Sequence, residues 1–290
     1  MNQIKSAKPK PEPLAAEIEK RVSQLFICYA ASLHRFFNAR GRSPGYASPF
    51  ETPKLYPGRV AAASQMPNPA ASEVAQKPWL ADYRRLIFVS DMGDALSKDV
   101  PFDFLLNEIV RTVTTEAGKR HIWLWLSKRP RRMAEFSDWL EAQGIEWPDN
   151  LVAMTSVTGP KTVGRVQQLL RVRALHRGLS VEPLWGKVSL PLEGIDWVIV
   201  GGESGKEAQP FHVEWAEQII GDCKAEEIPV FLKQLGKRPF YQGQALSLTD
   251  SHGGDWNEWP HHLRVRELPG EWKQTPANPS ESTQLEFTTW

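Results

Sequence analysis

The chain has 290 residues and a mass of 32.8 kDa, with 41% hydrophobic and 24% charged residues, which is typical of a soluble globular protein and excludes disorder throughout. Its 35 basic and 34 acidic side chains give a formal net charge of +1, so only a local patch could attract nucleic acid or an anionic membrane. Cys28 and Cys223 are too few for a disulfide framework. With no apolar run long enough to span a membrane and no signal-peptide pattern, we expect a cytoplasmic protein without a membrane partner.

The two ends of the chain are expected to lie outside the folded core. Residues 1–13 carry Pro and Lys with little to bury, which predicts a disordered tail. Residues 14–37 have apolar side chains at helical spacing. Residues 38–80 are rich in Pro, Gly, Ser and Ala, which predicts a loop-rich insert, and residues 270–290 are predicted to be a flexible tail. The core is therefore expected to be a single β/α domain over residues 14–269.

Short apolar runs alternate with helical patterns between residues 86 and 236. The runs are typical of strands buried on both faces. They are IFVSD (87–91), IWLWLS (122–127), LVAMTSV (151–157), GLSVEPL (178–184), DWVIVGG (196–202) and PVFLKQL (229–235). The link from Trp185 to Ile195 is too short for a crossover helix, but helical patterns separate most of the other runs. This alternation predicts an α/β fold with a parallel sheet, either a complete or partial barrel or an open doubly wound sheet.

Polar residues follow these runs, at the strand ends where a parallel sheet places its ligand site. The candidate ligand-binding residues are Asp91, Asp94, Lys128, Arg129, Ser156, Gly201, Gly202, Glu203, Ser204, Lys233 and Gln234. Because six strand ends would contribute to one mouth, the pattern predicts a site for a small polar ligand. Helix capping by the Ser, Thr and Asp residues is the structural alternative, and it stays open.

Glu182 is unusual because a carboxylate beside a buried apolar run is costly unless it is paired or binds a ligand. Lys128 and Lys233 are the available partners. A structural ion pair and a functional role are equally compatible with this pattern. If the chain catalyses acid–base chemistry, Glu182 and Lys128 are the candidate catalytic residues.

A basic segment, KRPRR (128–132), begins a predicted helix directly after the second run. Such a segment can hold phosphates, and the alternative is a solvated helix face. Trp256 and Trp259 are candidates for an exposed stacking surface. The chain has no P-loop, H-E-x-x-H or G-x-S-x-G motif, and no G-x-G-x-x-G follows the first strand. ATPase, dehydrogenase, zinc-protease and serine-hydrolase functions therefore lack their signatures.

The ordered motifs of the chain resemble the phage-associated family called gene product 37/gene product 68. The matching segments are IFVSDMGD, LWLSKRPRRMAEF, AMTSVTG, LSVEPLWG, DWVIVGGESGKEAQPFHVEW, PVFLKQLG and GGDWNEWPHHLRVRE. The resemblance covers roughly residues 28–269. Members of this family are similar to radical S-adenosylmethionine (SAM) enzymes, so the resemblance implies a partial parallel β/α barrel and a SAM site.

The resemblance also implies a [4Fe–4S] cluster held by three cysteines, the last two in a C-x-x-C-Y-A segment. Only the end of this motif is present, at Cys28-Tyr29-Ala30, because Leu25 occupies the preceding cysteine position. One thiolate cannot hold a cluster that needs three protein ligands. Cys223, on a late predicted helix, is a poor substitute. We therefore expect no metal site in this chain, with Cys28 as the remnant of the motif.

The leading hypothesis is a phage- or mobile-element-type, radical-SAM-like barrel protein that has lost its cluster and keeps a strand-end pocket for SAM, a nucleotide or a nucleic-acid end. Asp91 and Glu203 would accept hydrogen bonds from the ligand. Lys128, Arg129 and Lys233 would face its phosphate or carboxylate. Two alternatives stay open: an active radical-SAM-type enzyme whose cluster ligands are completed by a partner, and a non-catalytic subunit that binds nucleic acid or a protein encoded nearby.

Overall fold

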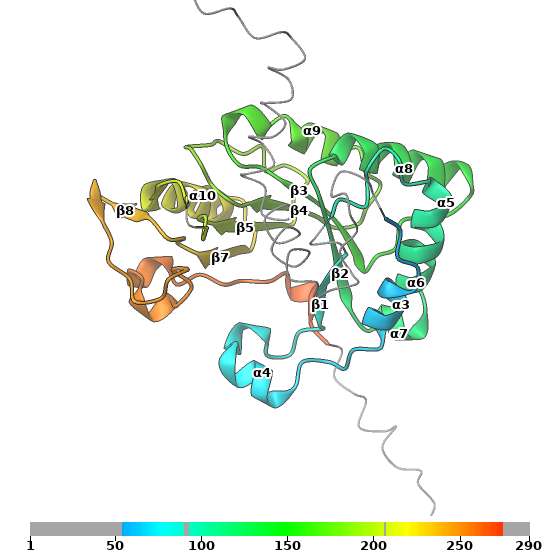
Figure 1. The fold of residues 1–290 in the computed structure, drawn as a ribbon, viewed down its shortest axis with the longest axis horizontal. Coiled ribbons are helices and arrows are strands. Elements are labelled where there is room, and N and C mark those ends of the chain that lie inside the picture. Colours follow the sequence, from blue (N-terminus) through cyan, green and yellow to red (C-terminus); the bar gives the residue numbers. More distant parts are fainter. Residues whose placement is uncertain (1–53, 90–92, 206, 275–290) are drawn as a thin grey trace, which may run out of the picture. The chain divides into compact units, whose positions relative to one another are not determined.

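Six parallel strands form the central sheet of the computed structural model, which describes residues 54–89, 93–205 and 207–274. The strands are β1 (Leu86–Phe88), β2 (Ile122–Ser127), β3 (Leu151–Ser156), β4 (Arg177–Val181), β5 (Trp197–Gly201) and β7 (Val230–Gln234). Their order in the sheet is β1-β2-β3-β4-β5-β7. The sheet curls into a half-barrel with helices against it (Figure 1). The predicted α/β fold and partial barrel are confirmed, and each of the six apolar runs overlaps a strand.

Helices connect most of the strands. They are α3 (Arg59–Ser64), α4 (Ala71–Gln76), α5 (Phe102–Leu105), a π-helical segment η2 (Leu106–Val110), α6 (Arg111–Val113), α7 (Glu116–Lys119), α8 (Pro130–Ala142), α9 (Arg165–Leu169) and α10 (Val213–Ala225). As the short Trp185–Ile195 link predicts, no helix separates β4 from β5. Helix α8 begins at Pro130, whose missing N–H would have no intrahelical partner in the first turn. None of the helices within the described ranges combines the length and the apolar character that crossing a membrane requires.

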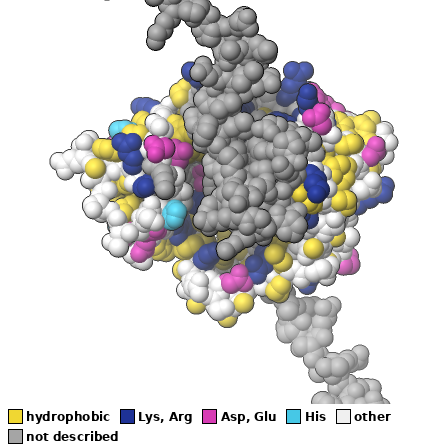
Figure 2. All heavy atoms as spheres, in the orientation of Figure 1, with side chains coloured by type: hydrophobic (Ala, Val, Ile, Leu, Met, Phe, Trp, Pro, Cys, Tyr) yellow, Lys and Arg dark blue, Asp and Glu magenta, His cyan; other side chains and the backbone are white. Residues whose placement is uncertain are grey.

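Smaller elements complete the described chain. A second sheet has the order β6-β8-β9 and contains β6 (Phe211–His212), β8 (Pro239–Tyr241) and β9 (Gln244–Ala245). The 3₁₀ segments are η1 (Pro78–Leu80), η3 (Pro160–Thr162), η4 (Trp256–Glu258), η5 (His261–Leu263) and η6 (Gly270–Trp272). Basic and acidic side chains are interspersed on the face seen in Figure 2, as a net charge of +1 leads one to expect.

The two faces of the main sheet bury different sets of side chains, because successive residues of a strand point to opposite faces. The larger cluster includes Trp123, Trp125 and the helix residue Phe136, which pack between the sheet and the helices. The smaller cluster lies on the inner face of the half-barrel. Its buried members are Ile122, Leu124, Val152, Met154, Trp197, Ile199, Leu268 and Trp272.

The C-terminal segment fills the inner face where the strands begin. Trp272 is fully buried, and its ring centroid lies 5.1 Å from that of Trp197, the first residue of β5. Residues 270–274 are thus part of the packed structure, although the sequence predicted that they belong to the flexible C-terminal tail. One large aromatic side chain decides this, since the apolar area it removes from water outweighs the polarity of its neighbours. Residues 275–290, the predicted N-terminal tail and Cys28 lie outside the described residues.

Trp256 and Trp259 do not form the expected exposed stacking surface. Trp259 is only 2% exposed and Trp256 is half-buried. The Arg266 guanidinium lies 5.1 Å from each of these two ring centroids and 4.2 Å from that of Trp79. It also donates hydrogen bonds to the carbonyl oxygens of Leu232, Lys233 and Gly254. These aromatic rings therefore surround an internal cation that joins the C-terminal segment to β7.

His121 predicts a pH dependence of folding. The ring is fully buried, its Nε2 lies 3.0 Å from the Ser64 carbonyl oxygen, and its Nδ1 has no hydrogen-bond partner among the described residues. Burial is the main cause that lowers the pKa of His121 below its ordinary value of 6.5. The unfolded state therefore binds more protons as the pH falls through that value. We expect stability to be fully present above about pH 6.5 and to decrease below it.

The measurement is urea unfolding at about pH 7.5 and about pH 5.5 for the parent and for His121→Gln. The Gln variant keeps a donor for the Ser64 carbonyl group and has no titrating ring, so its stability should change less between the two pH values. His261→Gln, at an exposed position, is the control and should behave as the parent does. An equal loss of stability in the parent and in His121→Gln would contradict the prediction.

Candidate functional site

The inner face of the half-barrel changes from apolar to polar along the strands. Two successive rows of the sheet show the change: first Leu126, Met154, Gly178 and Trp197, then Ser156, Ser180, Ile199 and Phe231. Beyond them, Gly201 pairs with Gln234 across a register shift, and Glu182 and Lys233 approach each other at the edge. The carboxyl ends of parallel strands meet at one edge, so the polar residues of the last rows gather there. This edge is the candidate functional site.

Glu182 and Lys233 form an ion pair across β4, β5 and β7. The Lys233 Nζ lies 3.2 Å from the Glu182 Oε2, and the Ser180 hydroxyl donates a hydrogen bond of 3.3 Å to Oε1. A Cβ on Gly201 would lie 3.0 Å from the same Oε2, so Gly201 gives the carboxylate its space. The Glu182 side chain is 18% exposed and that of Lys233 is 55% exposed, which leaves the pair accessible from the mouth.

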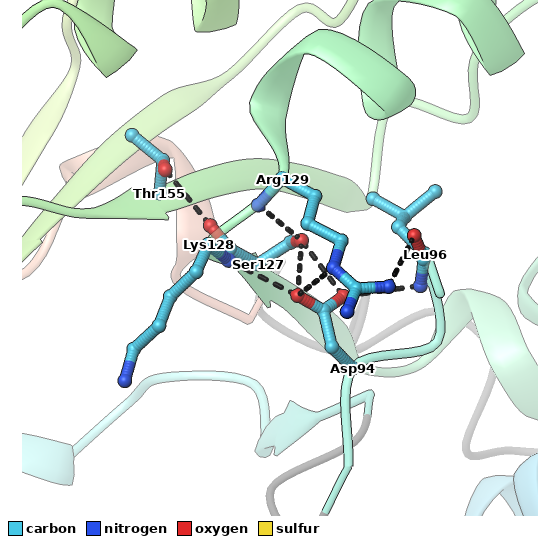
Figure 3. Close-up of polar contacts among 6 residues, drawn as sticks. All are labelled: Asp94, Leu96, Ser127, Lys128, Arg129 and Thr155. Atoms are coloured by element: carbon cyan, nitrogen blue, oxygen red, sulfur yellow. Dashed lines mark hydrogen bonds and ion pairs between the residues drawn. The ribbon is translucent and has the colours of Figure 1, made fainter. Parts of the chain in front are cut away.

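Lys128 is not the partner of Glu182. The two side chains, predicted as a catalytic acid–base pair, form no ion pair with each other, and within the described ranges Lys128 has no ion-pair partner. Lys128 follows Leu126 by two residues, and Figure 3 shows its side chain directed away from Asp94 and Arg129. Its role in catalysis stays a prediction. Ser156 is buried on the same inner face, and its carbonyl oxygen accepts a hydrogen bond from Arg165.

Gly202 and Gln234 hold two strand ends together. The Gly202 N–H donates to the Gln234 carbonyl oxygen, and the Gln234 Nε2 donates to the Gly202 carbonyl oxygen, each over 2.9 Å. A Cβ on Gly202 would lie 2.3 Å from the carbonyl oxygen of Leu235. Gly202 is predicted to bind a ligand, but the space that its missing side chain leaves is occupied by the chain's own backbone at Leu235.

Glu203 positions an exposed tryptophan. Its Oε2 accepts hydrogen bonds from the Trp185 Nε1 at 3.1 Å and from the Gln209 N–H at 3.0 Å. The Trp185 N–H donates to the Thr158 carbonyl oxygen, and the side chain is 44% exposed. The sequence pattern did not single out Trp185, because the exposure of a lone Trp after a strand depends on tertiary packing. Ser204 is half-buried in the loop after Glu203.

Asp94 is the centre of a hydrogen-bonded cluster at the ends of β1 and β2 (Figure 3). The Ser127 hydroxyl donates to its two carboxylate oxygens at 2.8 and 2.9 Å. The Leu96 N–H donates to Oδ1 at 3.0 Å, and the Lys128 N–H to Oδ2 at 3.3 Å. The Arg129 Nε lies 3.9 Å from Oδ2. Asp94 and Arg129, both predicted ligand groups, thus meet each other, while Asp91 lies outside the described residues.

An iron–sulfur cluster does not fit the donors of this chain. Cys223 is fully buried on α10, and burial raises the pKa of its thiol to about 12, so it stays protonated and inert. The described residues contain no group of three His, Cys, Asp or Glu side chains able to hold a metal ion. Cys28 is the only other cysteine in the sequence. The chain therefore cannot supply the three thiolates that would hold such a cluster.

Asp94→Asn is expected to loosen the loop between β1 and α5. The variant keeps the size of the side chain but replaces one carboxylate oxygen by an NH₂ group, which cannot accept from the Ser127, Leu96 or Lys128 donors. Hydrogen bonds to a charged group contribute about 1.5–3 kcal/mol, so we expect a loss of about 2 kcal/mol in urea unfolding. Asp99→Asn, at an exposed position, should change little. Equal stability of Asp94→Asn and the parent would refute the role of this cluster.

Comparisons with known proteins place the chain in a family without assigning it an activity. The searches of curated proteins and of solved structures returned no match. One family model, described as a protein of unknown function (DUF5131), matches residues 24–268. This range contains the whole main sheet and every candidate site residue. The chain therefore belongs to the DUF5131 family.

Proposed function

We propose that the chain binds a nucleotide-type ligand, SAM in the first instance, at the carboxyl edge of the half-barrel. The Glu182–Lys233 pair carries the proposal. A carboxylate and an ammonium group side by side can match the amino-acid end of SAM, with Glu182 accepting from the ligand ammonium and Lys233 donating to the ligand carboxylate. The pair is accessible, so a zwitterion can exchange partners with it without leaving a buried charge unpaired.

Neighbouring groups support an adenosine-type ligand. Trp185 offers an exposed indole that Glu203 holds in place, and a base can stack on such a ring. The hydroxyl groups of Ser156 and Ser180 lie in the row below the pair. The mouth thus combines an aromatic surface, hydroxyl groups and paired charges, which together suit a ligand with a base, a sugar and an amino-acid group.

The kinship with radical-SAM enzymes, and an origin in a phage or mobile element, belong to the same proposal. The half-barrel and its polar strand ends support the kinship with radical-SAM enzymes, and the resemblance of the motifs to the phage-associated family supports the origin. The cysteine content leads us to propose a pocket that was kept after the cluster was lost. An enzyme whose cluster ligands come from a partner is the competing hypothesis, and it requires the partner to supply at least two thiolates.

Calorimetric titration with SAM and with adenosine tests the proposed pocket. The parent should bind SAM more tightly than adenosine, because only SAM carries the amino-acid group. Glu182→Gln and Lys233→Met should each bind SAM about tenfold more weakly or worse, since each removes a charge-assisted hydrogen bond. Their affinity for adenosine should change little.

The matched control is Glu116→Gln with Lys119→Met, which removes an exposed ion pair of 3.9 Å far from the mouth in sequence. This control should bind SAM as the parent does. Thermal melting of all variants establishes that they are folded. The proposal fails if the parent gives no heat with SAM, or if Glu182→Gln and Lys233→Met retain the parent's preference for SAM over adenosine.

A further inference from the structure

A groove of about 500 Å³ lies between the start of α8 and the segment that contains η3 and α9. Its cationic lining residues are Lys128, Arg129, Arg131, Arg132, Lys161 and Arg165, and Glu135 is the one carboxylate among its lining residues. We call it the basic groove. The whole chain has a net charge of only +1, so this is a local concentration of positive charge.

The charge of the basic groove is largely uncompensated. Glu135 pairs with Arg131 at 3.2 Å, and Asp94 lies 3.9 Å from Arg129. Lys128 and Lys161 have no ion-pair partner in the part of the chain that the structure describes. The first turn of α8 contains no acidic residue and no side-chain cap, so the partial positive charge of that helix end adds to the groove.

The opposite end of the same pair of helices is neutralised. Arg173 pairs with Glu141 at 2.7 Å and with Asp138 at 3.5 Å, and Arg171 lies 3.8 Å from Asp138. Acidic partners are therefore present where α8 ends and largely lacking where it begins. The two ends of this helix pair thus differ in how far carboxylates compensate their arginines.

Two of the arginines are held in place by the protein. Arg165 donates to the Ser156 carbonyl oxygen at 2.9 Å. Arg132 donates to the Val100 carbonyl oxygen at 2.8 Å and lies 4.6 Å from the Phe102 ring centroid. Each guanidinium has five N–H groups, so donors remain for a ligand after these bonds are made. Fixed guanidinium groups bind phosphate with less loss of side-chain entropy than mobile ones.

We infer that the basic groove binds the phosphodiester backbone of a nucleic acid. Six cations contributed by α8, its preceding loop and the η3–α9 segment are more than one phosphate group needs, and they suit successive phosphates along a strand. The groove is open to solvent, and its lining carries no aromatic side chain for reading a base. Binding is therefore expected to depend on charge and to tolerate sequence. This inference does not depend on the proposed SAM site.

Fluorescence anisotropy with a labelled single-stranded DNA of about 20 nucleotides, the same RNA sequence and the duplex tests the groove. The variant is Arg131→Gln with Lys161→Gln, two exposed positions. We expect the parent to bind at least one probe, the variant to bind it about tenfold more weakly, and the slope of log K against log salt to become shallower by about 1 to 2.

The matched control is Arg171→Gln with Arg173→Gln, which removes the same charge at the neutralised end and should stay within about twofold of the parent. Glu182→Gln should keep nucleic-acid affinity, so that failure of the SAM site and failure of the groove are distinguished. The inference is overturned if the parent binds none of the three probes, if both double variants weaken binding equally, or if inorganic phosphate at micromolar concentration displaces the probe completely.

Discussion

Parallel pairing of six strands is the constraint on which the rest of this structure depends. It buries the sheet on both faces, so the strands must be apolar over most of their length. It also brings all the carboxyl ends to one edge. The apolar requirement ends there, and residues such as Ser180, Glu182 and Lys233 can occupy the last rows. The site is thus a consequence of strand direction before any single side chain is considered.

Many of the polar residues at this edge stabilise the frame. Asp94 joins the loop after β1 to the start of α8, and Glu203 holds Trp185 and the loop around Gln209. Gly202 allows the chain to pass close to Leu235. Because backbone groups at strand ends lose their ladder partners, they need polar side chains to satisfy them. A site at such an edge therefore shares its residue types with the scaffold that supports it.

Two surfaces with different chemistry lie at the same edge. The inner one combines a carboxylate, an ammonium group and an indole at Glu182, Lys233 and Trp185. The outer one is the basic groove, whose charged lining residues are all cationic except Glu135. Lys128, which directly follows β2, lines the groove. A zwitterionic small molecule suits the inner surface, and a polyanion suits the outer one.

The sequence by itself determined the alternation of strands and helices, because periodicity of apolar residues depends only on local geometry. It also determined that polar groups meet at the carboxyl edge and that two of the three cluster cysteines are lacking. Only the tertiary structure decided that Glu182 pairs with Lys233 and not with Lys128, that Trp185 is exposed while Trp259 is buried, and that Trp272 belongs to the core. These outcomes rest on contacts between residues distant in sequence, where burial and partner choice follow from packing and not from local pattern.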